Sequence, residues 1–201
     1  MVYLGSLLSA DGRIEAELSR RLGMAQKDFQ ILQRVWAHAN ISKQRKTLIY
    51  NACIVSTLLY GLGTAWLNAS ERRRLDAFNA KCLRKLMGIS PSYYSRVSND
   101  TVLRVAKAEK CSTKLLRQQL LLFGKIARMP AGTPLRDILL EPGSCRLRTT
   151  QGIRNRGRPR TSWPCAVRAE AVRIVSGEQH LVEIIGNVKA WRKCVCESIK
   201  D

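Results

Sequence analysis

The sequence predicts a mostly α-helical protein with a helical bundle, a basic irregular loop and a small C-terminal helical tail. Apolar residues recur at helical spacing through the first 140 residues, and hydrophobic residues make up 45% of the 201-residue chain, which is enough to form a core. No alternation typical of a strand follows residue 10, apart from a possible strand at residues 137–140. The expected divisions are an opening segment (1–12), the bundle (13–130), an Arg/Gly/Pro-rich basic linker (131–163) and the tail (164–201).

The first helix is expected over residues 13–38 and would be about 39 Å long. Asp11-Gly12 is a turn signal, and Asp11 can cap this helix. One face carries apolar residues at steps of three or four, namely Ile14, Leu18, Leu22, Ala25, Phe29, Leu32 and Trp36. The opposite face carries Arg20, Arg21, Lys27 and Arg34, which we expect to point outward.

Ser42 is a suitable N-cap for a second helix. This helix is apolar almost all round, so we expect it to be the central buried element; its apolar residues include Leu48, Ile49, Ala52, Cys53, Val55, Leu58 and Leu59. Its start is basic, with Lys43, Arg45 and Lys46, and this charge opposes the helix dipole. An anion bound at that end would relieve the conflict.

Further helices follow the glycines at positions 61 and 63. The expected starts are Ser70, then Ser98 or Asn99, then Ser112, and Gly88 is expected to end the helix that Ser70 begins. Two short helices are expected in the tail, over about residues 165–176 and 190–200. The four tryptophans are expected to anchor helix packing.

The charge balance points to a polyanionic partner. There are 35 basic and 15 acidic residues, a net charge of +20 and a pI near 10.4, for which nucleic acid is the usual partner and an anionic membrane the second. A membrane is not expected, because no apolar run approaches the roughly 20 residues needed to span one. We expect an intracellular protein, nuclear or cytoplasmic, because the start lacks a signal-peptide pattern.

The sequence offers little for a metal site or for small-molecule chemistry. The seven cysteines are scattered without CxxC pairs, so we expect mostly buried, reduced thiols rather than disulfides. Cys165, His180, Cys194 and Cys196 have the wrong spacing for the usual zinc knuckle. No phosphate-binding glycine loop or nucleophile elbow is present, so no metal, cofactor or small-molecule substrate is expected.

Two basic segments are candidates for phosphate contact. Arg72, Arg73 and Arg74 lie in the first turn of the third helix, with Arg84 and Lys85 further along it; a solvated charged face is the open alternative. Residues 142–169 contain seven arginines and no carboxylate. The centre of that segment holds Arg154, Arg156, Arg158 and Arg160, whose planar guanidinium groups suit phosphate. A nuclear-localisation-like or merely disordered linker is the alternative there.

Several short motifs occur in a characteristic order and spacing. They are Tyr3-Leu4-Gly5 with Asp11-Gly12, Arg20-Arg21 before Trp36, Lys46, Leu59-Tyr60-Gly61 with Trp66, the run FNAKCLRKLMGI at 78–89, Ser98-Asn99, Phe123-Gly124 with Arg128-Met129, Gly157-Arg158-Pro159 with Trp163, and Trp191-Arg192. Together they resemble the C-terminal part of LINE-type (non-LTR) retrotransposon reverse transcriptases of jockey- and RTE-like elements. The family often has Gly-His before the Arg-Met step, whereas this chain has Gly124-Lys125.

The resemblance implies that Tyr3, Leu4 and Gly5 form a primer-grip hairpin in residues 1–12. Residues 13–130 would be a helical thumb lying along a template-primer duplex of RNA, DNA or their hybrid, alongside the other polymerase domains. The Mg²⁺-binding Ala-Asp-Asp motif of such enzymes lies upstream, and no two carboxylates are adjacent in this chain, so the chain alone is expected to be inactive as a polymerase. The alternatives are a free-standing basic helical RNA- or DNA-binding protein and a non-functional truncated retroelement product.

Overall fold

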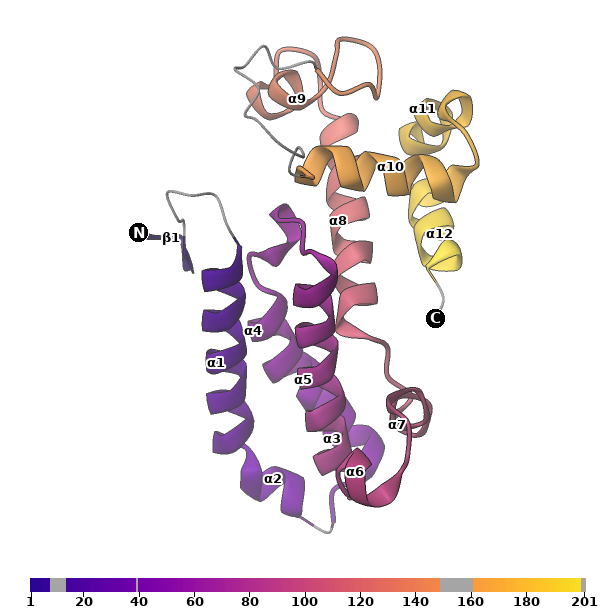
Figure 1. Cartoon of the computed structure of the whole chain (residues 1–201). Coiled ribbons are helices and arrows are strands. Elements are labelled where there is room, and N and C mark those ends of the chain that lie inside the picture. Colours follow the sequence, from indigo (N-terminus) through magenta and orange to yellow (C-terminus); the bar gives the residue numbers. More distant parts are fainter. Residues whose placement is uncertain (8–13, 39, 149–160, 200–201) are drawn as a thin grey trace. The chain divides into compact units, whose positions relative to one another are not determined.

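The computed structural model describes residues 1–7, 14–38, 40–148 and 161–199, and it divides the chain into two compact units (Figure 1). Unit 1 covers Met1–Leu115 and unit 2 covers Leu116–Lys200, so the boundary falls inside helix α8 (Cys111–Ala127). The mostly α-helical class is confirmed, because the described elements are helices apart from one short hairpin. The boundary at residue 115 lies within the range 13–130 that was expected to form one bundle.

Unit 1 begins with a tight hairpin of β1 (Val2–Tyr3) and β2 (Ser6–Leu7), which pair antiparallel. Its two-residue turn holds Leu4 at φ 45° and Gly5 at φ 76°, and two positive φ values are what such a turn requires. Glycine adopts this conformation without strain, whereas leucine does so at a cost. The guanidinium groups of Arg20 and Arg21 both donate to the carbonyl of Gly5, which ties the turn to the first helix.

The expected single helix over residues 13–38 is broken into α1 (Glu15–Ile31) and α2 (Gln33–Ala37). Leu32, at φ −85° and ψ 13°, lies between them outside helical geometry. The Trp36 indole N–H donates to the Phe29 carbonyl over 2.8 Å, and a continuous helix would use that carbonyl for the backbone of Gln33. The turn also stacks Trp36 on Phe29 with ring centroids 5.3 Å apart, so side-chain packing explains the break.

The second expected helix consists of α3 (Lys43–Ile49), a π-helical segment η1 (Tyr50–Val55) and α4 (Ser56–Leu59). Ser42 caps it, as expected, by accepting the amide of Arg45. Although this helix is apolar almost all round, it is only partly buried. Ile54 and Leu58 are fully buried, but Leu48 is 68% exposed and Cys53 is also exposed. Only one face of this helix packs on α1 and α5, so its remaining apolar residues meet solvent.

After a 3₁₀ turn η2 (Leu62–Thr64), the long helix α5 (Ala69–Met87) begins two residues earlier than expected. Asn68, not Ser70, is its N-cap, and it forms a reciprocal capping box with Glu71. Gly88, in the left-handed region at φ 70°, ends α5 as expected. The shorter helices α6 (Ser92–Ser95) and α7 (Asn99–Ala106) follow, and the side chain of Ser98 caps α7.

The core of unit 1 is built where α1, η1, α4 and α5 meet. Its fully buried side chains include Leu18, Ile54, Leu58, Leu62, Leu75 and Leu83. The apolar stripe of α1 packs on α4, the helix that carries Leu58 and Leu59. One polar link lies inside this core, where the Tyr50 hydroxyl donates to Asn79 Oδ1 over 2.9 Å.

Unit 2 contains α8 from Leu116 onward, then α9 (Pro134–Leu139), α10 (Trp163–Val175), α11 (Glu178–Gly186) and α12 (Val188–Ser198). The possible strand at 137–140 is wrong, because α9 occupies it and only Leu140 forms a bridge, with Leu147. Helix α11 was not expected.

Trp191 is fully buried, donates to the Leu120 carbonyl over 3.1 Å, and lies so close to Gly124 that a Cβ there would collide with the indole.

The cysteines only partly follow the expectation of buried thiols. Cys82, Cys111 and Cys145 are buried, Cys53, Cys165 and Cys196 are exposed, Cys194 is intermediate, and all seven are free. Burial raises the pKa of Cys82 and of Cys111 to about 12, so these two thiols are unreactive at neutral pH. Within the described ranges, no group of His, Cys, Asp and Glu side chains has the arrangement of a metal site.

Candidate nucleic-acid interface

The most continuous positive surface in unit 1 lies along α5. Arg73, Lys81 and Lys85 are separated by multiples of four residues, so they share one side of the helix, and all three are exposed. Arg74 lies beside them and is also exposed. The exposed face of α5 otherwise carries only Ser70 and Ala77 in this stretch. We call Arg73, Arg74, Lys81 and Lys85 the α5 basic face; it runs about 18 Å along the helix.

The carboxylates of α5 are engaged elsewhere and do not neutralise this face. Glu71 is buried in the capping box, where its side chain accepts the amide of Asn68 over 2.7 Å. Asp76 accepts the backbone N–H of Ser112 over 2.9 Å and its hydroxyl over 2.6 Å. Within the described residues, Arg73, Lys81 and Lys85 have no ion-pair partner, so their charges are available to an external anion.

The neighbouring side of α1 adds the cation Lys27 to this surface and also carries the exposed carboxylate of Glu15. Arg74 donates to the Ser19 hydroxyl over 3.1 Å and forms a loose ion pair with Glu15 at 3.7 Å. Gly23 and Lys27 follow Ser19 at four-residue steps on the same face of α1 and are exposed. Serine and glycine have small side chains, so a large partner can approach this part of α1 closely. Lys27 lies one helical turn after Gly23.

The residues expected to contact nucleic acid have very different environments. The exposed residues are Lys27, Arg34, Lys43, Arg45, Arg73, Arg74 and Lys85. The partly covered ones are Arg20 and Arg72, and the buried ones are Arg21, Lys46 and Arg84. The part of the chain that the structure describes does not include Arg154, Arg156, Arg158 and Arg160. The hairpin residues Tyr3, Leu4 and Gly5 are exposed, and the Leu4 carbonyl accepts the Tyr60 hydroxyl over 3.0 Å. Arg72 lies over the Trp66 ring at 5.2 Å, which removes it from the α5 basic face.

The expectation that Arg21 points outward is wrong. Its side chain is 4% exposed, forms an ion pair with Glu17 at 2.7 Å and lies over the Tyr60 ring at 4.6 Å. The helical pattern placed it on the polar face of α1, but the N-terminal hairpin folds over that part of the face. Arg21 therefore holds the hairpin against α1 and is not available to bind phosphate.

Lys46 and Arg84, which were also expected to bind nucleic acid, are buried, and this burial argues against a phosphate contact. Lys46 Nζ donates to the carbonyl of Trp36 over 2.7 Å, because the end of α2 lies against the start of α3. Arg84 donates to the carbonyls of Ser90 and Val97 and to Asn99 Oδ1, at 3.3, 2.6 and 2.9 Å. Both side chains donate to carbonyl oxygens at chain turns. The pattern of charges along the sequence does not reveal these contacts.

The cluster around Glu17 makes the stability of unit 1 depend on pH. Burial by itself would raise the pKa of Glu17, but hydrogen bonds from Arg20, Arg21 and the Leu7 amide outweigh it and lower the pKa. A carboxyl with a lowered folded-state pKa stabilises the fold above its unfolded pKa, about 4.3, and this stabilisation is lost as pH falls through the folded value.

We therefore expect Glu17→Gln to be less stable than the wild type at neutral pH and to lose less stability on acidification below about pH 5. Urea unfolding across a pH series measures both effects. Glu15→Gln is the matched control, since Glu15 is on the same helix and its side chain is 66% exposed. Parallel pH curves for the wild type and Glu17→Gln would contradict this assignment.

An aromatic pair that the sequence did not single out lies just beyond α5. Tyr93 and Tyr94 in α6 are 78% and 71% exposed, and their ring centroids are 4.1 Å apart. A hydrogen bond with Tyr94 raises the pKa of Tyr93 above its usual value. The sequence signal was a Tyr-Tyr pair after Ser90-Pro91, where a turn is expected at the surface.

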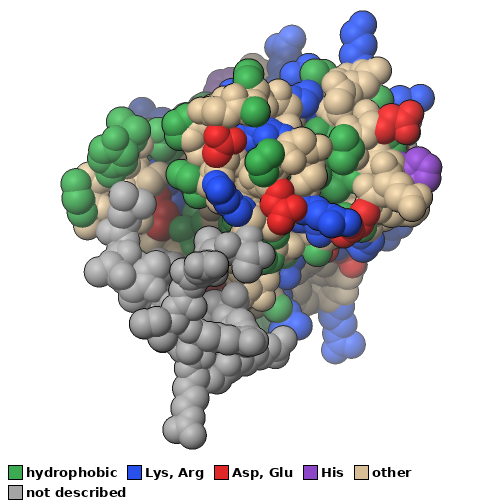
Figure 2. All heavy atoms as spheres, turned by 90° about the horizontal axis from the view of Figure 1, so that it is seen from above, with side chains coloured by type: hydrophobic (Ala, Val, Ile, Leu, Met, Phe, Trp, Pro, Cys, Tyr) green, Lys and Arg blue, Asp and Glu red, His purple; other side chains and the backbone are tan. Residues whose placement is uncertain are grey.

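The surface of unit 2 is more mixed in charge. Arg168 pairs with Glu178, and Arg173 with Glu170, each at 2.7 Å. On the face drawn in Figure 2, blue Lys and Arg side chains alternate with red Asp and Glu side chains and with hydrophobic groups. In the described part of this unit, α12 carries three exposed cations, Lys189, Arg192 and Lys193, together with the exposed carboxylate of Glu197.

A cavity of about 380 Å³ in unit 2 is lined by Arg128, Arg136 and Cys145, among others. Arg128 donates to the carbonyl of Ile185 over 2.9 Å, and Arg136 to that of Ala127 over 3.4 Å. Both acceptors lie at C-terminal helix ends, where cations stabilise the helix dipole. The partial negative charges of these two helix ends disfavour an anion in the cavity. Arg136 Nη1 is buried without a hydrogen-bond partner among the described residues.

Comparison of the chain with models of known protein families, with curated proteins and with solved structures finds no match. The helices that the structure describes include none with both the length and the apolar content needed to cross a bilayer. The properties of the α5 basic face and of the exposed tyrosines are therefore the observations on which a function can be built.

Proposed function

We propose that the chain binds nucleic acid through the phosphate backbone, with the α5 basic face as the centre of the contact. The observation that carries this proposal is an exposed helix face with four cations and no carboxylate, in a chain of net charge +20. A solvated helix face normally mixes the two signs, which keeps its own repulsion low. Three of these cations, Arg73, Lys81 and Lys85, have no ion-pair partner among the described residues, and their mutual repulsion is relieved when a polyanion neutralises them.

The length of the α5 basic face supports a contact with several phosphates. Its two ends, Arg73 and Lys85, are about 18 Å apart along the helix axis. Lys27 and Arg34 on the α1–α2 side provide further exposed cations. Such contacts fix position and orientation without reading base sequence.

We further propose that this binding serves a reverse transcriptase of the LINE type, in which the helices of unit 1 hold a template-primer duplex as a thumb. The motif order in the sequence supports this assignment, and the tight hairpin with Tyr3, Leu4 and Gly5 at its turn suits a primer grip. Nucleotide addition would then depend on metal-binding carboxylates that this chain does not contain.

The test of the proposed surface is a triple variant, Arg73→Gln with Lys81→Gln and Lys85→Gln. The slope of log affinity against log salt should become shallower by about 0.9 per lost phosphate contact, and duplexes of unrelated sequence should be affected equally. Fluorescence anisotropy with labelled duplexes at several salt concentrations gives these slopes. The fold should be unaffected, because all three side chains are exposed.

The matched control removes three exposed positive charges from α12 by Lys189→Gln, Arg192→Gln and Lys193→Gln. It changes the net charge of the chain equally, so it measures the general effect of charge alone. If both triple variants reduce the slope by the same amount, the α5 basic face has no special role and the proposal of a defined surface is wrong.

A further inference from the structure

The tyrosine pair in α6 is unusual because two large rings are exposed side by side. Tyr93 and Tyr94 are the two tyrosines with the greatest exposure among the described residues, and their planes are inclined by 49°. Aromatic rings contribute most to stability when buried, so an exposed pair gains little for the fold. Its outer ring faces are available to a flat partner.

The pair is held on a firm support. The buried guanidinium group of Arg84 donates to the Ser90 and Val97 carbonyls, which lie on either side of α6 in the chain. The amide of Tyr94 donates to the Pro91 carbonyl over 3.0 Å, and the Ser95 hydroxyl donates to the Ser90 carbonyl over 3.1 Å. Because the backbone of α6 is fixed in this way, a ligand stacking on the rings loses little conformational entropy of the protein.

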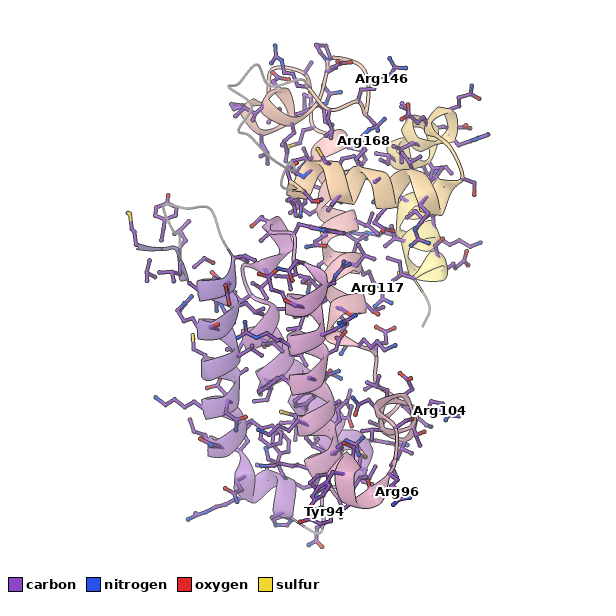
Figure 3. All side chains as sticks on the ribbon, in the orientation of Figure 1. Tyr94, Arg96, Arg104, Arg117, Arg146 and Arg168 are labelled. Carbon is purple, nitrogen blue, oxygen red and sulfur yellow. The ribbon has the colours of Figure 1, made fainter. Side chains whose placement is uncertain are left out.

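Basic residues flank α6 in the sequence. Arg96 directly follows α6, is exposed and has the left-handed conformation at φ 52°, and Lys85 stands in the last turn of α5. Figure 3 shows Tyr94, Arg96 and Arg104 at the same end of unit 1, from α6 and α7. The nearby carboxylate of Asp100 lies 3.4 Å from Lys110, which reduces its repulsion of an anion.

We propose that Tyr93 and Tyr94 form a stacking platform for an unpaired base of a single-stranded nucleic acid, with Arg96 and Lys85 contacting the adjoining phosphates. Stacking on aromatic side chains beside a cationic path is the general mode of single-strand binding, and it accepts every base. Each base of a duplex is already stacked, so the platform distinguishes unpaired from paired strands. This inference rests on the proposed nucleic-acid binding and adds the kind of strand that α6 recognises.

The experiment compares two double variants. One carries Tyr93→Ala and Tyr94→Ala, and the matched control carries Tyr93→Phe and Tyr94→Phe. The alanine variant should bind a single-stranded oligonucleotide about five- to 150-fold more weakly per stacked base, with an unchanged salt slope. The phenylalanine variant should bind like the wild type, because stacking needs the ring and not the hydroxyl. Both should bind a blunt duplex like the wild type, and both should unfold at the wild-type temperature because the side chains are exposed.

Unchanged single-strand affinity in the alanine variant would overturn the platform, as would an equal loss in the phenylalanine variant. A loss of self-association in the alanine variant with no change in oligonucleotide affinity would assign the pair to protein contact and would also overturn it. Duplex binding in the same assay tests the proposed function separately. If the wild type binds neither duplex nor single strand, the proposed function fails and the platform fails with it.

Discussion

The affinity of the chain for nucleic acid should fall by roughly a thousandfold or more between 50 and 200 mM salt, if about six to ten phosphates are neutralised. The structure supplies a suitable number of exposed cations in unit 1, namely Lys27, Arg34, Lys43, Arg45, Arg73, Arg74, Lys81 and Lys85. Each phosphate contact releases condensed counterions, and this release becomes less favourable as the bulk salt concentration rises. Titrations of a labelled duplex at stepwise salt concentrations measure the slope directly.

Two duplexes of unrelated sequence serve as the control for this prediction. Backbone contacts carry no sequence information, so both duplexes should give the same slope and nearly the same affinity. An affinity that stays flat across this salt range would mean that phosphate contacts do not drive binding. A strong preference for one duplex would mean that the chain reads bases, which the α5 basic face cannot explain.

The second large effect concerns the core of unit 1. Phe29→Ala should lower the free energy of unfolding by about 3–5 kcal/mol, as truncation of a buried aromatic residue does. Phe29 is 5% exposed, stacks on Trp36, and meets the edge of Tyr50 with ring centroids 6.2 Å apart. Its removal leaves a cavity between α1 and η1 and takes away the ring on which Trp36 packs. Urea unfolding followed by tryptophan fluorescence measures the loss.

Lys27→Ala is the matched control, since Lys27 lies two residues away on the same helix and is exposed. It should leave the free energy of unfolding nearly unchanged, because an exposed side chain makes few contacts. It should weaken nucleic-acid binding slightly, because Lys27 extends the surface next to the α5 basic face. Equal destabilisation by Lys27→Ala and Phe29→Ala would contradict the assigned faces of α1.

Periodic features of the chain could be predicted, because they depend on residues close in sequence. The apolar stripe of α1, the Ser42 cap and the glycine that ends α5 all follow local rules of helix geometry, and the structure confirms each of them. The start of α5 was placed at Ser70 rather than Asn68, because serine and asparagine are both good caps. The reciprocal contact between Asn68 and Glu71 decides between them.

The candidate site could be predicted only in part, because burial of a charged residue depends on distant segments. Arg73, Arg74 and Lys85 are exposed as expected, but Arg21 and Arg84 are covered by the hairpin and by the turns around α6. The covering segments supply carbonyl oxygens, which make a buried guanidinium acceptable. A pattern of charges along one helix contains no information about which loop returns to cover it.

By itself, the sequence determined the helical class, the strong positive charge and the candidate phosphate contacts on α5, since composition and periodicity are properties of the chain alone. Tertiary structure decided which cations are free, because packing of the hairpin, α2 and α6 removes Arg21, Lys46 and Arg84 from the surface. It also decided that Tyr93 and Tyr94 are exposed together on a fixed support, since the support comes from the buried side chain of Arg84 reaching across two turns. Local spacing sets the face on which a side chain starts, and long-range packing sets whether that face meets solvent.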